Sequence, residues 1–359
     1  PGFMWRFSLV PCSGGWSWKP DSLGFHWRTA AFNLQLRLGH CHLEFSDLYL
    51  EATGRAWYKT WALDPLRHEI TGSALEGVTR LRQHIEASVS KREFRIKWDG
   101  VGMRGALFET QAGEMYVLRR NLPHALPFHT LGYGQRVESA LLAPAIRTGG
   151  LVLFTGGASS GKTVGLTAWT VAMMRTYGGA GYTVENPIEI ELEGDYTGED
   201  GVTGTLYQKE IDEDEQFGHE IRRRLRGGPN LLMIGELRNA DAVAQALLAA
   251  TSGVVVGASY HANDQITGLQ RLSGMVRDAG FDGGLFANGL AAVIHQQMVL
   301  THREGEITRQ LRVSPLILTG SRNETGIRSQ LHGVDFRQLS TEVDHQRRVM
   351  ANLSTGVAF

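Results

Sequence analysis

The sequence predicts an α/β fold in which a parallel sheet flanked by helices follows a smaller α+β domain. Three observations support this prediction. The run "GLVLFTG" (150–156) is continuously apolar and ends in glycine, as buried parallel strands often do. Strand and helix patterns alternate after it as far as about residue 320. Before it, residues 41–122 contain short alternating strands and one amphipathic helix, which is typical of an α+β domain.

The composition is that of an ordinary globular protein. The chain has 359 residues, of which 42% are apolar and 20% charged, and its formal net charge is −1. This length is enough for one large domain or two ordinary ones. The balanced charge does not indicate a nucleic-acid or acidic-lipid binder. No run approaches the ~20 apolar residues of a membrane span.

The cysteines and the N-terminal segment give little information about function. Cys12 and Cys41 are expected to be reduced thiols of a cytosolic protein. They form no C-x-x-C pair, so no zinc ribbon is predicted. Residues 1–40 stay unassigned, because tryptophans lie among glycine and proline and no charged stretch followed by an apolar run predicts a signal peptide.

Residues 41–122 are expected to form the α+β domain. The stretches "LEFSDLYLEA" and "GRAWYKTWAL" predict two strands joined by a glycine-containing turn. Apolar residues recur at helical spacing over 73–89, and Ser73 is a plausible N-cap. Three more strands are predicted from "EFRIKWDGV", "GALFETQAG" and "EMYVLRRNLP". The proline-containing residues 123–134 then predict a linker.

Residues 135–320 are expected to form the second domain. "RVESALLAPAIRT" predicts a helix, and the apolar strand 150–156 follows it. The alternating patterns after that strand are "GLTAWTVAMMRTY", "AGYTVENP", "FGHEIRRRLRG", "NLLMIGEL", "ADAVAQALLAAT", "GVVVGASYH" and "QITGLQRLSGMVRDAG". Residues 321–359 read as a polar helical segment without a motif.

A phosphate-binding motif, G-x-x-x-x-G-K-[ST], lies between the strand 150–156 and the next predicted helix. This position between a strand and a helix supports the motif. The residues expected to bind the nucleotide are Gly156, Gly157, Ala158, Ser159, Ser160, Gly161, Lys162, Thr163 and Val164. Backbone N–H groups of the loop would hold the phosphates. Lys162 would reach the β- and γ-phosphates, and Thr163 would bind Mg²⁺. A chance match in a turn is the alternative, and the flanking elements count against it.

Polar residues also follow three other apolar strands. "LLMIGE" ends at Glu236, "YTVENPIEIE" carries Glu185 and Glu189, and "VVVGASYH" ends at His261. Taken alone, a glutamate after an apolar strand is more often a solvated strand end. However, ligands bind outside the carboxyl ends of parallel strands. We therefore expect Lys162, Glu185, Glu236 and His261 to lie around one crevice.

These stretches, in this order, resemble the motifs of the secretion ATPase superfamily (PilT/GspE/type IV secretion ATPases). "GGASSGKT" resembles its Walker A box and "TVENPIEIE" its Asp box. "EIRRRLRGGPNLLMIGELRNAD" resembles its Arg-rich helix and Walker B box, and "SGVVVGASYHAND" its His box. "FSDLYLEATG", "FRIKWDG" and "YVLRRNLP" resemble strands of its N-terminal domain. The resemblance covers roughly residues 44–320.

The resemblance implies a RecA-like P-loop ATPase domain after a PAS-like N-terminal domain, assembled as a homo-hexamer. It implies ATP hydrolysis with Mg²⁺, and catalytic roles for Lys162, Glu236, Glu185 and His261. The metal would be bound through the nucleotide by Thr163 and Glu236.

The resemblance also assigns roles to arginines and to partners. Arg95 and Arg119 match arginines of the N-terminal domain that meet the phosphates, and Arg222 and Arg226 match a basic helix that acts at the subunit boundary. The implied location is cytoplasmic and peripheral at the inner membrane, on secretion, conjugation or pilus platform proteins. Neither zinc nor direct nucleic-acid binding is expected.

Three positions depart from the family pattern. Asn186 and Asn239 stand where the family usually or often has aspartate, and Val254 stands where it often has a first His-box histidine. Each change removes a charge or a titrating group near the expected site. We therefore expect a divergent member that still hydrolyses ATP. Slow turnover and dependence on a partner are both compatible with these changes.

The branch follows from what the sequence lacks. Assembly motors of pili and type II systems usually carry a four-cysteine zinc module, and this sequence has no C-x-x-C. The favoured interpretation is a DotB-like ATPase of type IV secretion or conjugation. The alternative is a PilT-like retraction motor, since "GIRSQLHGVDFRQLSTEV" loosely resembles its late signature. A RecA-like DNA motor and a non-hydrolysing, nucleotide-gated scaffold are less favoured.

Overall fold

The computed structural model describes residues 36–38, 41–43, 45–62, 64–303, 306–333 and 336–351. They form two compact units with a boundary between Pro123 and His124. A two-stranded ladder of β1 (Leu36–Leu38) and β2 (Cys41–Leu43) comes first in the chain. Among these residues, no helix combines the length and the hydropathy that crossing a bilayer requires.

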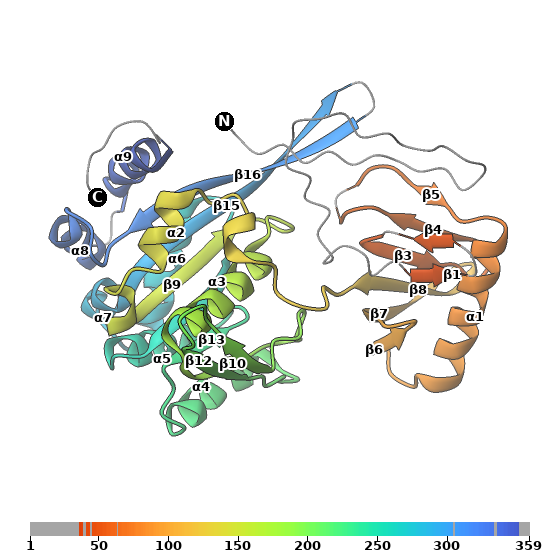
Figure 1. Cartoon of the computed structure of the whole chain (residues 1–359), viewed down its shortest axis with the longest axis horizontal. Coiled ribbons are helices and arrows are strands. Elements are labelled where there is room, and N and C mark those ends of the chain that lie inside the picture. Colours follow the sequence, from red (N-terminus) through yellow and green to blue (C-terminus); the bar gives the residue numbers. More distant parts are fainter. Residues whose placement is uncertain are drawn as a thin grey trace. The chain divides into compact units, whose positions relative to one another are not determined.

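The N-terminal unit is a six-stranded antiparallel sheet in the order β5-β4-β3-β8-β7-β6 (Figure 1). Its strands are β3 (Asp47–Leu50), β4 (Ala56–Lys59), β5 (His68–Glu69), β6 (Glu93–Trp98), β7 (Val101–Thr110) and β8 (Gly113–Arg120). Helix α1 (Ser73–Ser88) packs its buried Leu81 and Ile85 in one cluster with Leu48, Met103 and Leu118 of the sheet. The α+β unit expected over 41–122 therefore has one helix on one sheet face.

The start of α1 corrects one expectation. The N-cap residue is Gly72, which has no side chain to accept a hydrogen bond, and Ser73 already lies inside the helix. The prediction that Ser73 caps this helix is therefore wrong. The helical range agrees with the predicted one to within a residue.

The C-terminal unit is built on an eight-stranded sheet in the order β11-β12-β10-β13-β14-β9-β15-β16. Its strands are β9 (Gly150–Gly156), β10 (Gly179–Val184), β11 (Gly194–Thr197), β12 (Thr203–Tyr207), β13 (Leu231–Ile234), β14 (Val255–His261), β15 (Leu290–Arg303) and β16 (Glu306–Ile317). The strands from β12 to β15 pair in parallel, and β11 and β16 pair antiparallel at the two edges. The predicted mixed α/β fold with a parallel sheet is confirmed.

Helices cover both faces of this sheet (Figure 1). They are α2 (Gln135–Leu141), α3 (Lys162–Tyr177), α4 (Phe217–Leu225), α5 (Ala240–Thr251), α6 (Gln265–Asp278), α7 (Gly283–Gly289), α8 (Glu324–His332) and α9 (Leu339–Ala351). On one face Trp169 of α3 contacts Phe154 of β9. On the other, Leu151 and Leu153 of β9 share a core cluster with Leu247 of α5 and residues of α4, α6, α7 and α8.

Two segments differ from the sequence expectation because of proline. The helix expected over "RVESALLAPAIRT" stops at Leu141, since Pro144 cannot continue it, and a 3₁₀ turn (Ile146–Thr148) follows. The long β15–β16 pair is unexpected. Pro315 interrupts the strand pattern, and it is tolerated because β16 is the last strand of the sheet.

The segment predicted as a linker packs onto the C-terminal unit. A 3₁₀ turn, η2 (Phe128–Thr130), precedes Tyr133. Phe128 and Tyr133 are both buried and their rings are in contact, and the Tyr133 ring meets the edge of Phe154. These two aromatic residues therefore fix residues 128–133 against β9, next to the predicted phosphate-binding loop.

Candidate nucleotide site

The predicted phosphate loop joins β9 to α3 at the carboxyl edge of the sheet. Ser159 takes a left-handed conformation (φ 57°), and Gly161 (φ 88°) is the N-cap residue of α3, which begins at Lys162. At Gly156 a side chain would lie under 3.0 Å from the backbone oxygen of Gln296, so only glycine fits between loop and β15. The N-terminus of a 16-residue helix behind such a loop is suited to binding an anion.

Lys162 folds back onto this loop. Its ammonium donates to the carbonyl oxygen of Gly157 at 2.7 Å and to that of Gly156 at 3.1 Å. Burial lowers the pKa of Lys162, and the carboxylates of Glu236 and Glu189 oppose that change. The ammonium is therefore placed at the loop, in the electrostatic reach of two carboxylates from other strand ends.

The four predicted strand-end residues lie at one edge of the sheet. β10, β13, β14 and β9 are neighbours in that order and all run parallel. Glu185 follows β10, Glu236 follows β13, His261 ends β14 and Lys162 follows the loop after β9. His261 is exposed and stands opposite Gly156 in the ladder. These residues therefore share one edge of the sheet, because the carboxyl ends of neighbouring parallel strands lie at the same edge.

The two glutamates after β10 differ sharply. Glu185 is 2% exposed, and its Oε1 accepts from Thr183 Oγ1 at 2.7 Å and from Gln208 Nε2 at 2.9 Å. The Glu189 charge, by contrast, acts on Lys162. The catalytic role assigned to Glu185 stays a prediction, and Glu189 is the carboxylate of this segment whose charge reaches the loop lysine.

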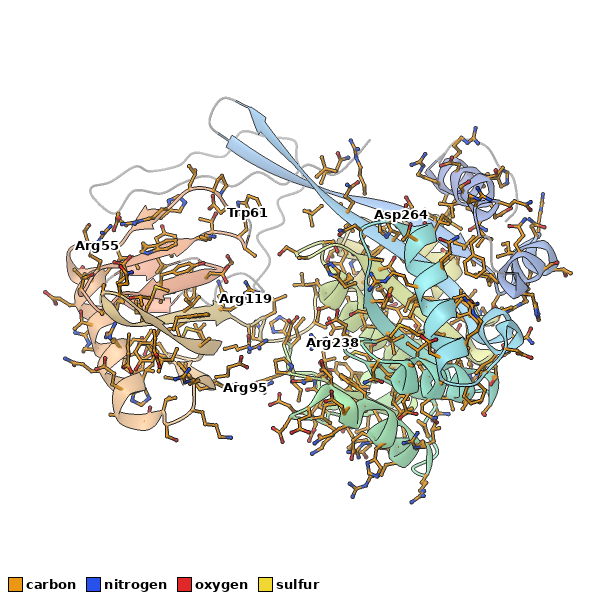
Figure 2. The ribbon with its side chains drawn as sticks, turned by 180° about the vertical axis from the view of Figure 1, so that it is seen from behind. Arg55, Trp61, Arg95, Arg119, Arg238 and Asp264 are labelled. Carbon is orange, nitrogen blue, oxygen red and sulfur yellow. The ribbon has the colours of Figure 1, made fainter. Side chains whose placement is uncertain are left out.

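Glu236 is half-buried and paired with Arg238. Arg238 Nε donates to Glu236 Oε2 at 2.8 Å, and the same guanidinium binds both oxygens of Asp214 at 3.0 and 2.9 Å. Figure 2 labels Arg238 in this unit. The Walker B position therefore carries a carboxylate whose one oxygen is fixed by an arginine two residues later.

β15 adds two residues beside the loop that were not among the predicted site residues. His295 stands opposite Thr155 in the ladder, and its Nδ1 lies 3.0 Å from Thr155 Oγ1. Burial lowers the pKa of His295, Asp264 opposes that change and Lys162 adds to it. Gln296 is 1% exposed, and its Oε1 has no hydrogen-bond partner among the described residues. The apolar run "LAAVI" ending in His-Gln was the available signal.

The predicted arginines of the N-terminal unit lie in one cross-strand row. Arg95 of β6 faces Arg104 of β7, which faces Arg119 of β8, and Arg119 faces Asp47 of β3. Arg119 Nε donates to the buried Asp47 at 2.8 Å. Figure 2 labels Arg95 and Arg119. Arg104 is a third member of the row that sequence reasoning missed, and contact of Arg95 and Arg119 with phosphate stays a prediction.

The basic helix α4 is largely paired within the chain. Arg222 donates to Asp241 of α5 at 2.8 Å, and Glu220 accepts from Arg224 at 3.2 Å. Arg226 follows the last residue of α4 and is exposed. It precedes the start of β13, so it lies toward the sheet edge opposite the phosphate loop. Its contact with a neighbouring subunit, and that of Arg222, stay predictions.

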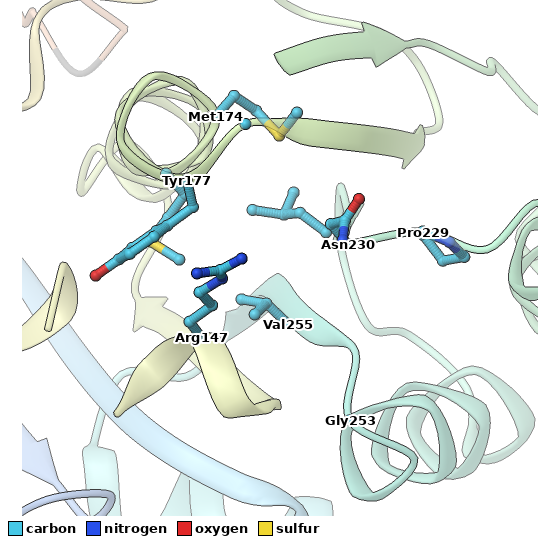
Figure 3. A pocket seen from close by; sticks show the side chains of 10 residues that line it. Arg147, Met174, Tyr177, Pro229, Asn230, Gly253 and Val255 are labelled. Carbon is cyan, nitrogen blue, oxygen red and sulfur yellow. The ribbon is translucent and has the colours of Figure 1, made fainter. Parts of the chain in front are cut away.

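A cavity of about 100 Å³ lies at this opposite edge (Figure 3). Asn230, Leu231 and Val255 line it at the starts of β13 and β14, and the Arg147 guanidinium lies over the Tyr177 ring at 5.5 Å from its centroid. This cavity is separate from the loop and from the strand ends that carry charge. The candidate nucleotide site rests on the loop and its neighbours, with the Lys162 ammonium folded against the loop carbonyls.

Comparisons with known proteins agree with this geometry. Residues 88–343 match the family described as "Type II/IV secretion system protein". A curated relative, "Protein transport protein HofB homolog" of Haemophilus influenzae, is 29% identical over 71% of this chain and 55% of its own length. Further curated relatives include proteins named as type II secretion system protein E. The chain spans about half the length of the curated relatives it matches.

Solved structures show the same fold. The chain resembles the pilus retraction motor PilT with bound ADP at a TM-score of 0.60 and 21% identity, covering 85% of both chains. It resembles the ATPase DotB of Legionella pneumophila at a TM-score of 0.62 and 18% identity, covering 85% of this chain and 84% of that one. Because the family match spans most of the chain, this protein belongs to the Type II/IV secretion system protein family.

Proposed function

We propose that this chain binds ATP with Mg²⁺ in a RecA-like domain and hydrolyses it to drive a secretion or pilus machine. The observation that carries the proposal is the convergence of a helix-backed glycine loop, Lys162 and Glu236 at one sheet edge. Family membership supports the same activity. In this proposal the four strand ends supply the groups that bind phosphate and activate water.

The residues present fit the proposed Mg²⁺·ATP. Thr163 is the second residue of α3 and is half-buried, and its hydroxyl with the Glu236 carboxylate supplies the oxygen ligands that Mg²⁺ prefers. The loop amides and the α3 N-terminus favour phosphate. Lys162 Nζ already donates to two loop carbonyl oxygens, and it could exchange these acceptors for phosphate oxygens. Bound Mg²⁺ would neutralise charge on the phosphates, and Glu236 would orient the attacking water.

Phosphate release with Mg·ATP tests this proposal. Lys162→Ala should lower kcat by about 100-fold or more, and Glu236→Gln by ~100-fold while ATP binding is retained. Lys209→Ala is a matched control, because Lys209 is an exposed lysine of the same unit. Wild-type protein that binds no ATP, or a Lys162→Ala protein with full activity, would contradict the proposal.

The finer assignment is a homo-hexameric, DotB-like ATPase of type IV secretion or conjugation. We place it in the cytoplasm, peripheral at the inner membrane, on platform proteins of that machine. The lack of a C-x-x-C pair in the sequence favours this branch. A PilT-like retraction motor is the second candidate, since the sequence after 320 loosely resembles that branch. Light scattering with and without Mg·ATP checks the hexamer. Neighbouring genes for conjugation or for pilins would decide between the branches.

A further inference from the structure

Arg238 joins two carboxylates at the Walker B position. Its Nε and Nη2 point at Glu236 Oε2, at 2.8 and 2.7 Å, and its Nη1 binds both oxygens of Asp214. A guanidinium held on two sides is fixed in its plane, because its donors have a rigid fork geometry. The side chains of Arg238, Asp214 and Glu236 are 44%, 32% and 28% exposed, so the group is partly shielded from water.

Asp214 is itself held from two neighbouring elements. It is the first residue of the 3₁₀ turn η4 (Asp214–Gln216), before α4. Its Oδ1 accepts from Asn186 Nδ2 at 3.0 Å, and its backbone oxygen accepts from Asn239 Nδ2 at 2.7 Å. The carboxylate thus has a defined position between the segment after β10 and the segment after β13.

The two carboxylate oxygens of Glu236 have different surroundings. Oε2 accepts the hydrogen bond from Arg238 Nε and forms the ion pair with Nη2, whereas Oε1 receives no hydrogen bond from any described residue. A carboxylate with one pinned and one open oxygen has a fixed direction for the open one. Loss of Asp214 would leave Arg238 free to rotate, and the direction of Oε1 would no longer be fixed.

We propose that Asp214 is a positioning residue for Glu236, acting through Arg238, and that it supplies the carboxylate that Asn186 lacks. The inference rests on the proposed ATPase function. Asn186 contributes an amide where a carboxylate would be expected, and that amide donates directly to Asp214. The negative charge beside Arg238 therefore comes from η4, 28 residues away from Asn186 along the chain.

The test measures kcat and KM for ATP in three single variants and two double variants. Asp214→Asn should lower kcat about 10-fold, as loss of an outer-shell partner does, with KM within about twofold of wild type because Asp214 does not touch the phosphates. Arg238→Lys keeps the charge and loses the fork, so it should lower kcat similarly. Asp212→Asn is the matched control: Asp212 is exposed, and its loss should leave kcat unchanged.

The decisive variant, N186D/D214N, moves the carboxylate from position 214 to position 186. In N186D/D214N the new carboxylate at position 186 accepts from the new amide at 214, whose oxygen accepts from Arg238. The double variant should recover at least half of the wild-type kcat. The D214N/R238K double should be no slower than Arg238→Lys alone, since both act through one path.

The outcomes separate this inference from the proposed function. Wild type that turns over ATP, together with full kcat in Asp214→Asn or no recovery in N186D/D214N, would overturn the inference alone. A wild-type protein without turnover would overturn both. If Asp214→Asn fails to fold, Arg238→Lys decides: an unchanged kcat in that variant overturns the inference.

Discussion

Replacing Gly165 with alanine would place a methyl group where Tyr133 already lies. A Cβ at Gly165 would sit under 3.0 Å from the Tyr133 hydroxyl oxygen, 3.1 Å from Cζ of the same ring and 3.2 Å from Oε1 of Gln296. Overpacking this severe costs about 2–3 kcal/mol, the upper part of the usual range. Alanine recovers about 1 kcal/mol as the better helix former. The net expected loss is roughly 1–2 kcal/mol, or about 2–8 °C in Tm for a unit of this size.

Tyr133→Phe should remove most of that loss. The Tyr133 hydroxyl is buried and has no hydrogen-bond partner among the described residues, and burial raises the pKa of this phenol far above its ordinary value. Deleting an unsatisfied buried hydroxyl is expected to leave stability unchanged or to raise it by about 1 kcal/mol. Without the oxygen, the ring carbon at 3.1 Å must yield only a few tenths of an ångström.

The assay is a double-mutant cycle by calorimetry on wild type, Gly165→Ala, Tyr133→Phe and the double variant. The cost of Gly165→Ala should be smaller in the Tyr133→Phe background by at least about 1 kcal/mol. Equal costs in the two backgrounds would refute the reasoning, because the clash would then lie elsewhere. A Gly165→Ala protein at least as stable as wild type would refute it as well.

Three further predictions concern the same unit. Burial lowers the pKa of His295 below its ordinary value, so the unfolded state binds the proton more readily and stability falls as pH drops below about 6.5. His295→Asn should therefore reduce the difference in Tm between about pH 7.5 and about pH 5.5. Asp264 caps α6 by accepting from the Thr267 amide at 2.8 Å, so Asp264→Ala should cost about 1 kcal/mol in denaturant unfolding, with Asp278→Ala as the control. Gln346 binds both the N–H and the C=O of Ile317, at 2.7 and 3.0 Å. Gln346→Ala should cost about 2–3 kcal/mol and raise hydrogen exchange over α9, and unchanged exchange there would contradict the role of this bond pair.

Much of the second sheet could be predicted because its strands are buried on both faces. The strand 150–156 is apolar throughout, and every residue of β9 is buried. Parallel strands also carry their functional groups at one edge. That single rule predicts that Lys162, Glu236 and His261 lie at the same edge of the sheet. The same reasoning placed Glu185 at the edge but could not show that its carboxylate is enclosed by Thr183 and Gln208.

The residues that were missed lie on elements with weaker patterns. β15 and β16 form a long antiparallel pair in which Pro315 breaks the strand signal. His295 and Gln296 therefore had no assigned element, and their place beside Thr155 and Gly156 could not be inferred. Arg104 was missed for a different reason. A cross-strand row exists only once the register is known, since register moves every side chain to one face or the other.

The asparagines at 186 and 239 have a different interpretation once their contacts with Asp214 are taken into account. Each asparagine looked like the loss of a charge, yet each donates its Nδ2 to Asp214, Asn186 to the side chain and Asn239 to the backbone oxygen. Asn239 also caps α5 through Oδ1, which accepts from the Ala242 amide at 2.8 Å.

A carboxylate at 239 could cap α5 but could not donate to Asp214, and one at 186 would repel it. In this group Asp214 carries the carboxylate, and the side chains at 186 and 239 are amides. The family pattern instead often has aspartates at 186 and 239. Comparison with the family motif, one position at a time, indicates the loss of two carboxylates. The network around Arg238 nevertheless contains two carboxylates, those of Glu236 and Asp214, and one guanidinium. On this reasoning the asparagines alone give no ground to expect slow turnover, and the rate should depend on whether Asp214 is present.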